Sequence, residues 1–84
     1  MTTTVTEFVA HYTRPSGSSW EQTKAAWNRH ALAAWLEAAD QRGLQVSVHE
    51  VLDSHNVIAI VEVDGQRYGV HHLGRGMELQ AKPC

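Results

Sequence analysis

Histidine is the residue type that most suggests chemistry in this chain, because there are six histidines in 84 residues and His71 directly precedes His72. An imidazole nitrogen is a common zinc ligand. Adjacent residues of a β-strand point to opposite faces of the sheet, so His71 and His72 cannot both bind one ion within a regular strand. His49 shares a face with His71 in the register predicted below, but an intervening strand puts them roughly 10 Å apart, whereas zinc ligands lie about 2.0–2.1 Å from the ion. We therefore expect no metal site and no cofactor.

Acidic residues form the second candidate set. Four of them lie between residues 50 and 64, after the predicted helix: Glu50, Asp53, Glu62 and Asp64. A helix followed by three strands with such carboxylates superficially resembles the core of metal-dependent nucleases, which use an aspartate and then a Glu-x-Lys motif. In the stretch 62–64, Glu-Val-Asp, an aspartate stands where that motif needs lysine, and exposed strand positions explain these charges better. A small nuclease-like enzyme that binds a metal through His49, His71 and Glu62 stays an alternative, which metal-dependent thermal stabilisation would support.

Basic residues are too few and too scattered to predict nucleic-acid or membrane binding, since the net charge is −2 with seven basic and nine acidic residues. The Gly-Arg-Gly stretch at 74–76 lacks the spacing of a phosphate-binding loop, and no helix is predicted after it. The element order also resembles double-stranded-RNA-binding modules, but those modules continue with a basic segment that opens a second helix. A nucleic-acid-binding module stays a second alternative, using the scattered basic residues Arg14, Arg67, Arg75 and Lys82. Affinity that falls steeply with salt would support it.

Length and composition predict one folded domain over residues 1–84. The chain is 43% hydrophobic and 19% charged, with three tryptophans, which is enough for a packed core and too apolar for a disordered chain. A domain of this size buries a modest fraction of its surface, and association of two copies is the simplest additional stabilisation. We therefore expect a homodimer.

Cysteine usage and the N-terminus predict the compartment. The single cysteine, Cys84, cannot form an internal disulfide, which favours the reducing cytoplasm. The opening residues, MTTTVTEFVAHYTRP, lack the basic start and unbroken apolar run of a secretory signal. No window approaches the apolar length of a membrane span, so we expect a cytoplasmic protein without a membrane partner.

The N-terminal half predicts one strand and one long helix. Residues 3–12 are rich in β-branched and aromatic side chains and predict a first strand. Ser18 and Glu21 have the spacing of a capping box, and the alanine-rich run after them has no internal glycine or proline, so we expect a helix from about Ser19 to Arg42 that ends before Gly43. Its apolar arc spans roughly half the circumference, against about 100° for an ordinary surface helix, which indicates a second contact surface.

The C-terminal half predicts an antiparallel meander. LQVSVHEVLD, VIAIVEVD and QRYGVHHL are three β-rich runs, and Asp64-Gly65 is a favoured two-residue hairpin turn. This turn sets four cross-strand pairs: Val63 with Gln66, Val61 with Tyr68, Ala59 with Val70, and Ile58 with His71. It also points His72 toward the helix, while residues 79–84 are expected to form a loose tail. The predicted fold is a single small α+β domain, one long helix packed on a three- to four-stranded antiparallel sheet in the order β-α-β-β-β.

One helix can cover only one face of such a sheet, so we expect the second face to meet a partner. In the predicted register this face carries the apolar residues Val51, Ile58 and Ile60. The polar residues around them are His49, Arg67 and His71. Trp20, near the start of the helix, is a candidate interface anchor. Because no catalytic motif accompanies this surface, the sequence predicts a small non-catalytic protein-binding module, an accessory or inhibitory protein that covers a surface of another protein and acts as a homodimer.

Overall fold

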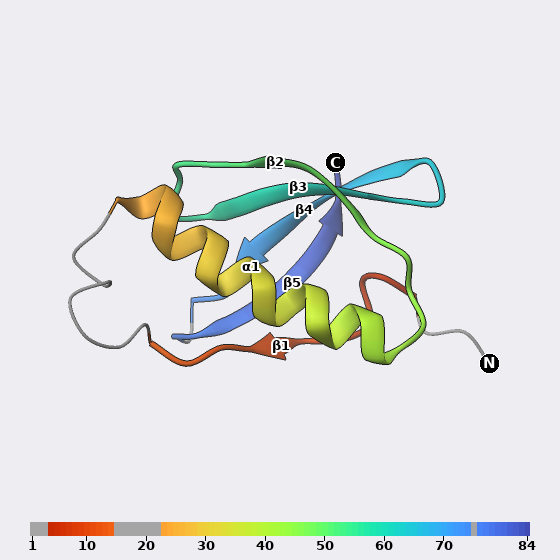
Figure 1. The fold of residues 1–84 in the computed structure, drawn as a ribbon, viewed down its shortest axis with the longest axis horizontal. Coiled ribbons are helices and arrows are strands. Elements are labelled where there is room, and N and C mark those ends of the chain that lie inside the picture. The colour runs from red at the N-terminus through yellow and green to blue at the C-terminus, as the bar shows by residue number, and fades with distance from the viewer. Residues whose placement is uncertain (1–3, 15–22, 75) are drawn as a thin grey trace.

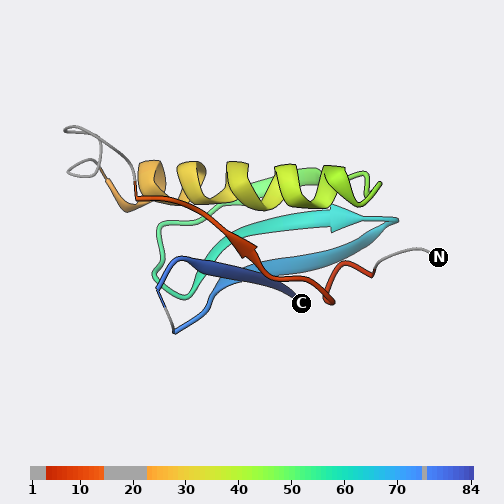
Figure 2. The same ribbon diagram turned by 90° about the horizontal axis from the view of Figure 1, so that it is seen from below.

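The computed structural model describes residues 4–14, 23–74 and 76–84, and within them it contains one helix and one five-stranded antiparallel sheet. The strands lie in the order β1-β5-β4-β3-β2, with β1 (Ala10–His11), β2 (Ser47–Val51), β3 (Val57–Val63), β4 (Gln66–His72) and β5 (Glu78–Pro83). The helix α1 (Lys24–Gln41) lies across one face of the sheet, as Figures 1 and 2 show from two directions. The predicted α+β architecture is confirmed, with five strands in place of three or four.

Helix α1 begins and ends at residues suited to capping. The side-chain oxygen of Thr23, the N-cap, accepts a hydrogen bond from the backbone N–H of Ala26 at 3.2 Å. Just beyond the other end, Gly43 has a φ of +78°, the left-handed conformation that follows many helices. The predicted capping box at 18–21 lies outside the described residues, in which the helix begins at Lys24.

The β3–β4 hairpin has the predicted turn. Asp64 and Gly65 have φ values of +53° and +79°, as a two-residue type I′ turn requires. Three of the four predicted cross-strand pairs are observed: Val63 with Gln66, Val61 with Tyr68, and Ala59 with Val70. The turn residues thus determine the register over the half of the hairpin nearest to them.

The fourth predicted pair, Ile58 with His71, is wrong, because a β-bulge interrupts β3. His71 pairs with Val57 instead of Ile58, since the register shifts between Val57 and Ala59. Ile58 is the inserted residue, and it is 1% exposed within the hydrophobic core. A bulge places two residues opposite one, so every side chain beyond it changes face relative to a regular register.

The C-terminal tail is also different from the prediction. Residues 79–84 were expected to be loose, whereas Glu78–Pro83 forms β5 between β1 and β4. Leu79 and Ala81 are fully buried. Alternation of these two apolar residues with polar neighbours is the period-2 pattern of a half-buried strand.

The predicted N-terminal strand over 3–12 is much shorter in the structure. Only Ala10–His11 pairs with β5, at the edge of the sheet. Residues 4–9, which precede it, form no strand, and Val5 and Phe8 are buried in the core.

Trp35 lies in the part of the core that the C-terminal half of α1 covers. It is fully buried, and its indole stacks on the Phe8 ring with 5.7 Å between centroids. The Arg42 guanidinium lies 4.4 Å from the centroid of the Phe8 ring and closes this end. Aromatic side chains thus occupy the space between the C-terminal half of α1 and the sheet.

Candidate functional site

Two of the residues predicted to bind a partner lie on the helix side of the sheet, so the prediction that they lie on the second face is wrong. Ile58 is buried in the core, and Val51 pairs with Ala59 and packs against that core. In both strands a β-bulge moves the residues beyond it to the other face of the sheet. One bulge lies in β3, and the other lies in β2 between Val48 and Glu50. Neither bulge is visible in the alternation of the sequence, which is why a regular register put both residues on the wrong face.

Three predicted residues do share one surface. Ile60, Arg67 and His71 lie on the face of the sheet opposite α1, which is the lower side in Figure 2. His49 is the inserted residue of the β2 bulge and is exposed at the edge of the sheet. Trp20 lies outside the described residues.

We call the face opposite α1 the open face, and the observed pairing divides it into rows that cross the strands. The first row runs from β2 to β5 through Glu50, Ile60, Gly69 and Lys82. The second row runs from β2 to β4 through Ser47, Glu62 and Arg67. The third row runs from β3 to β5 through Val57, His71 and Gln80. The apolar side chains of Ile60 and Val57 therefore lie near the middle of the face.

Charge is distributed unevenly across the open face. Acidic residues lie on the β2–β3 side and basic residues on the β4–β5 side: Glu50 and Glu62 against Arg67 and Lys82. Glu62 and Arg67 meet at the midline, where Oε1 and Nε are 3.9 Å apart in a loose, half-exposed pair. Glu78, at the far end of β5, is an acidic exception on the basic side, and its carboxylate is hydrogen-bonded to His11 Nε2 at 2.9 Å. The middle of the face thus has an acidic flank and a basic flank.

His71 covers the centre of this surface. A Cβ at Gly69 would lie 3.3 Å from His71 Nε2 and 3.2 Å from Val57 Cγ1, so these two side chains lean over the glycine. Burial lowers the pKa of His71, and the nearby charge of Lys82 lowers it further. The imidazole is therefore neutral at pH 7 and adds to the apolar middle of the face.

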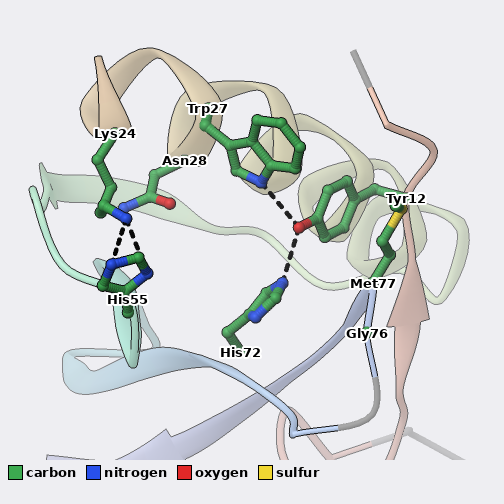
Figure 3. Close-up of a pocket in the computed structure, with 8 residues that line it drawn as sticks. All are labelled: Tyr12, Lys24, Trp27, Asn28, His55, His72, Gly76 and Met77. Atoms are coloured by element: carbon green, nitrogen blue, oxygen red, sulfur yellow. Dashed lines mark hydrogen bonds between the residues drawn. The ribbon is translucent and has the colours of Figure 1, made fainter. Parts of the chain in front are cut away.

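A second candidate site, the end pocket, lies between the N-terminal half of α1 and the sheet. Its volume is about 440 Å³. The lining residues come from α1, from β4 and from three connecting segments: Tyr12, Lys24, Trp27, Asn28, His55, His72, Gly76 and Met77. Figure 3 shows Lys24 and His55 on one side of this pocket and the hydroxyl of Tyr12 on the other.

A hydrogen-bonded group of three side chains forms the Tyr12 side of the end pocket. Trp27 Nε1–H donates to Tyr12 Oη at 2.9 Å, and Tyr12 Oη lies 2.7 Å from His72 Nε2 (Figure 3). Burial lowers the pKa of His72, and His55 lowers it further. His72 is thus neutral at pH 7, and its tautomer decides whether Nε2 accepts from Tyr12 or donates to it.

Asn28 fixes the opposite side. Its Nδ2 donates to the backbone oxygens of Leu52 at 2.7 Å and Ser54 at 2.9 Å. These bonds attach α1 to the connection between β2 and β3, which carries His55. Lys24 Nζ in turn lies 2.7 Å from Nδ1 and 2.5 Å from Nε2 of His55 (Figure 3). The polar groups of the pocket are therefore held in place from two elements.

The sequence indicated only part of the end pocket. The prediction that His72 points toward the helix is confirmed by its contact with Tyr12. Tyr12 falls within the predicted first strand and Trp27 within the predicted helix, and no role is predicted for Lys24. Asn28 offered a usable signal, because it is a polar residue on the buried side of α1 and is 3% exposed. A buried amide needs partners, which predicts a polar connection beside it.

The residues of the metal-dependent alternative do not form a cluster. Within residues 4–14, 23–74 and 76–84, no three His, Cys, Asp or Glu side chains are grouped so that they could hold a metal ion. His49, Glu62 and His71 lie on β2, β3 and β4 respectively, so a strand separates the two histidines.

The basic residues of the nucleic-acid alternative are dispersed. Arg67 and Lys82 share the open face, and Arg14 lies beyond β1. Arg75 is outside the described part of the chain. Among the helices that the structure describes, none has the length and apolar character needed to cross a bilayer.

The chain matches no protein-family model, no curated protein and no solved structure. Its function is therefore inferred from its own residues and contacts.

Proposed function

We propose that this protein is a non-catalytic protein-binding module that works as a homodimer, with the open face of each copy against the open face of the other. The observation that carries the proposal is the pattern of that face, an apolar middle between an acidic flank and a basic flank. A two-fold interface brings the same patch of both chains together, so the patch must complement itself. Rotation about an axis parallel to the strands, between β3 and β4, sets each acidic flank against the basic flank of the second copy.

The cross-strand rows make the expected contacts specific. Glu50 and Lys82 lie in one row at equal distances from this axis, so each Glu50 meets Lys82 of the second copy. Within one chain, β3 and β4 separate them by roughly 14 Å, so they do not pair there. Ile60 and Val57 lie beside the axis, where the two apolar middles meet.

The neutral state of His71 favours the same interface. A charged imidazole beside Lys82 would be costly to bury, whereas a neutral ring over Gly69 adds apolar area. An accessory or inhibitory role, exerted by covering a surface of a further protein, is the class of function that we propose for such a dimer. The cytoplasm is the compartment that we propose, because Cys84 is an exposed free thiol.

Sedimentation velocity over a wide range of protein concentration tests the assembly. We expect a concentration-dependent dimer for the wild type and a monomer for Ile60→Glu, since two buried carboxylates would meet at the axis. Far-UV circular dichroism of Ile60→Glu should be unchanged, because Ile60 lies outside the core. A wild-type monomer at hundreds of micromolar would refute the homodimer.

A charge exchange tests the orientation of the two chains. Glu50→Lys alone and Lys82→Glu alone each put like charges in two symmetry-related contacts, which should weaken self-association about tenfold or more. An equimolar mixture of these two variants should form a heterodimer, because each lysine of one chain then meets a glutamate of the other. If the mixture associates no better than either variant alone, the proposed axis is wrong even if the protein is dimeric.

A further inference from the structure

The end pocket is independent of the proposed homodimer. It opens between α1 and the sheet, on the opposite side from the open face, so association through that face leaves it accessible. Its volume of about 440 Å³ falls within the range of roughly 300–1,000 Å³ that is typical of small-molecule sites. The chemistry of its walls decides what such a molecule would be.

The charged and titratable groups at one side favour an anion. Lys24 supplies an ammonium group, His55 lies against it, and no carboxylate is present among the described lining residues. An ammonium group has three N–H donors, and Lys24 Nζ lies 2.7 Å from Nδ1 and 2.5 Å from Nε2 of His55. Two contacts to one ring leave at least one N–H of the ammonium for a carboxylate.

The opposite side offers a different polar group. Tyr12 Oη accepts the Trp27 indole N–H, which uses one of its two lone pairs. When Nε2 of His72 carries the proton, His72 donates to the second lone pair, and the hydroxyl proton of Tyr12 is left for a ligand. A ligand with an acceptor at this end would select that tautomer.

Apolar side chains also line the pocket. The Tyr12 and Trp27 rings meet edge to face, with centroids 6.3 Å apart and planes at 86°, and Met77 lines the same pocket. Aromatic faces and a thioether favour a flat apolar group. We propose that the end pocket binds a small elongated aromatic carboxylate, with its carboxylate at Lys24, its ring against Trp27 and Met77, and a hydrogen-bond acceptor at Tyr12.

Three related probes test this proposal on the wild-type protein by calorimetry and by NMR of the Trp27 indole N–H. We expect 6-hydroxy-2-naphthoate to bind and to shift this resonance. The neutral 6-hydroxy-2-naphthamide should bind about tenfold more weakly, because Lys24 loses its counter-charge. The analogue 2-naphthoate, without the hydroxyl, should bind several-fold more weakly. Absence of binding at millimolar concentration, or equal binding of the carboxylate and the amide, would overturn the proposal.

A pair of charge-removing variants locates the carboxylate. Lys24→Met should lower the affinity for 6-hydroxy-2-naphthoate about tenfold, with an unchanged circular dichroism spectrum. Arg29→Met removes the same charge from an exposed position of α1 outside the pocket lining and should leave that affinity unchanged. Equal losses in both variants would show that net charge, and not the pocket, attracts the probe, and the site would then be wrong.

Discussion

The two faces of the sheet are built on different physical chemistry. On the side of α1, the sheet presents fully buried apolar residues such as Val61, Val70 and Leu79, and Asn28 is the buried polar residue among those described. On the open face, Ile60 and Val57 are only partly buried and charged residues surround them. Apolarity and shape thus constrain one face, whereas the arrangement of charge distinguishes the other.

The sharpest test of this difference uses two isoleucines of one strand. Ile58→Glu should cost more than about 4 kcal/mol and prevent folding, because it places a carboxylate in the core without a partner. Ile60→Glu should change the free energy of unfolding of the monomer by about 1 kcal/mol or less, because its side chain reaches solvent on the open face. Urea denaturation followed by circular dichroism at low protein concentration measures both. Similar costs for the two variants would contradict the β3 bulge.

A smaller effect is expected at the polar residue of the covered face. Asn28→Ala removes two hydrogen bonds and leaves the backbone oxygens of Leu52 and Ser54 without their donors. The free energy of unfolding should fall by about 2–3 kcal/mol. The control is Arg29→Ala, an exposed neighbour on the same helix, for which a change within about 0.5 kcal/mol is expected. A matching small change for Asn28→Ala would mean that these bonds do not hold α1 to the β2–β3 connection.

Much of the fold was predictable because its signals are local. The alanine-rich run of α1 and the Asp64-Gly65 turn each act over a few residues, and the turn correctly aligned β3 with β4 near the hairpin. The two bulges were not predictable, since nothing in the alternation marks one inserted residue. They reassigned Ile58 and Val51, and so changed which residues could form the candidate surface.

The remaining departures depend on contacts between distant parts of the chain. Residues 79–84 form β5 because the edges of β4 and β1 are both available to pair with them. The end pocket likewise depends on Tyr12, Trp27 and His72, which are far apart in sequence and are brought together by the packing of α1 on the sheet. No local pattern reports such convergence, although the direction of His72 followed from the strand period.

Protonation of His71 and His72, which lie on opposite faces of the sheet, should lower the stability of the fold. Burial lowers the pKa of His71 on the open face and of His72 on the covered face. The unfolded chain, with an ordinary pKa near 6.5, therefore binds protons more readily, so stability is full above that pH and falls as the pH drops through the folded-state pKa values. Urea midpoints measured from pH 7.5 to pH 5 should decline, and the decline should be shallower in His72→Gln. If the urea midpoint of both His71→Gln and His72→Gln declines with pH as steeply as that of the wild type, these two histidines do not cause the decline.

The smallest expected effect on the single chain distinguishes the two faces most directly. Arg67→Ala removes a loose pair with Glu62, 3.9 Å long and half exposed, so the free energy of unfolding of a single chain should change by at most about 0.5 kcal/mol. This is best measured in the Ile60→Glu background, where no dimer is expected. In the wild-type background, the same substitution should weaken self-association several-fold, because in the proposed dimer Arg67 also lies beside Glu62 of the second copy. If Arg67→Ala destabilises the single chain and leaves association unchanged, the charges of the open face act within the chain, and the distinction between the two faces fails.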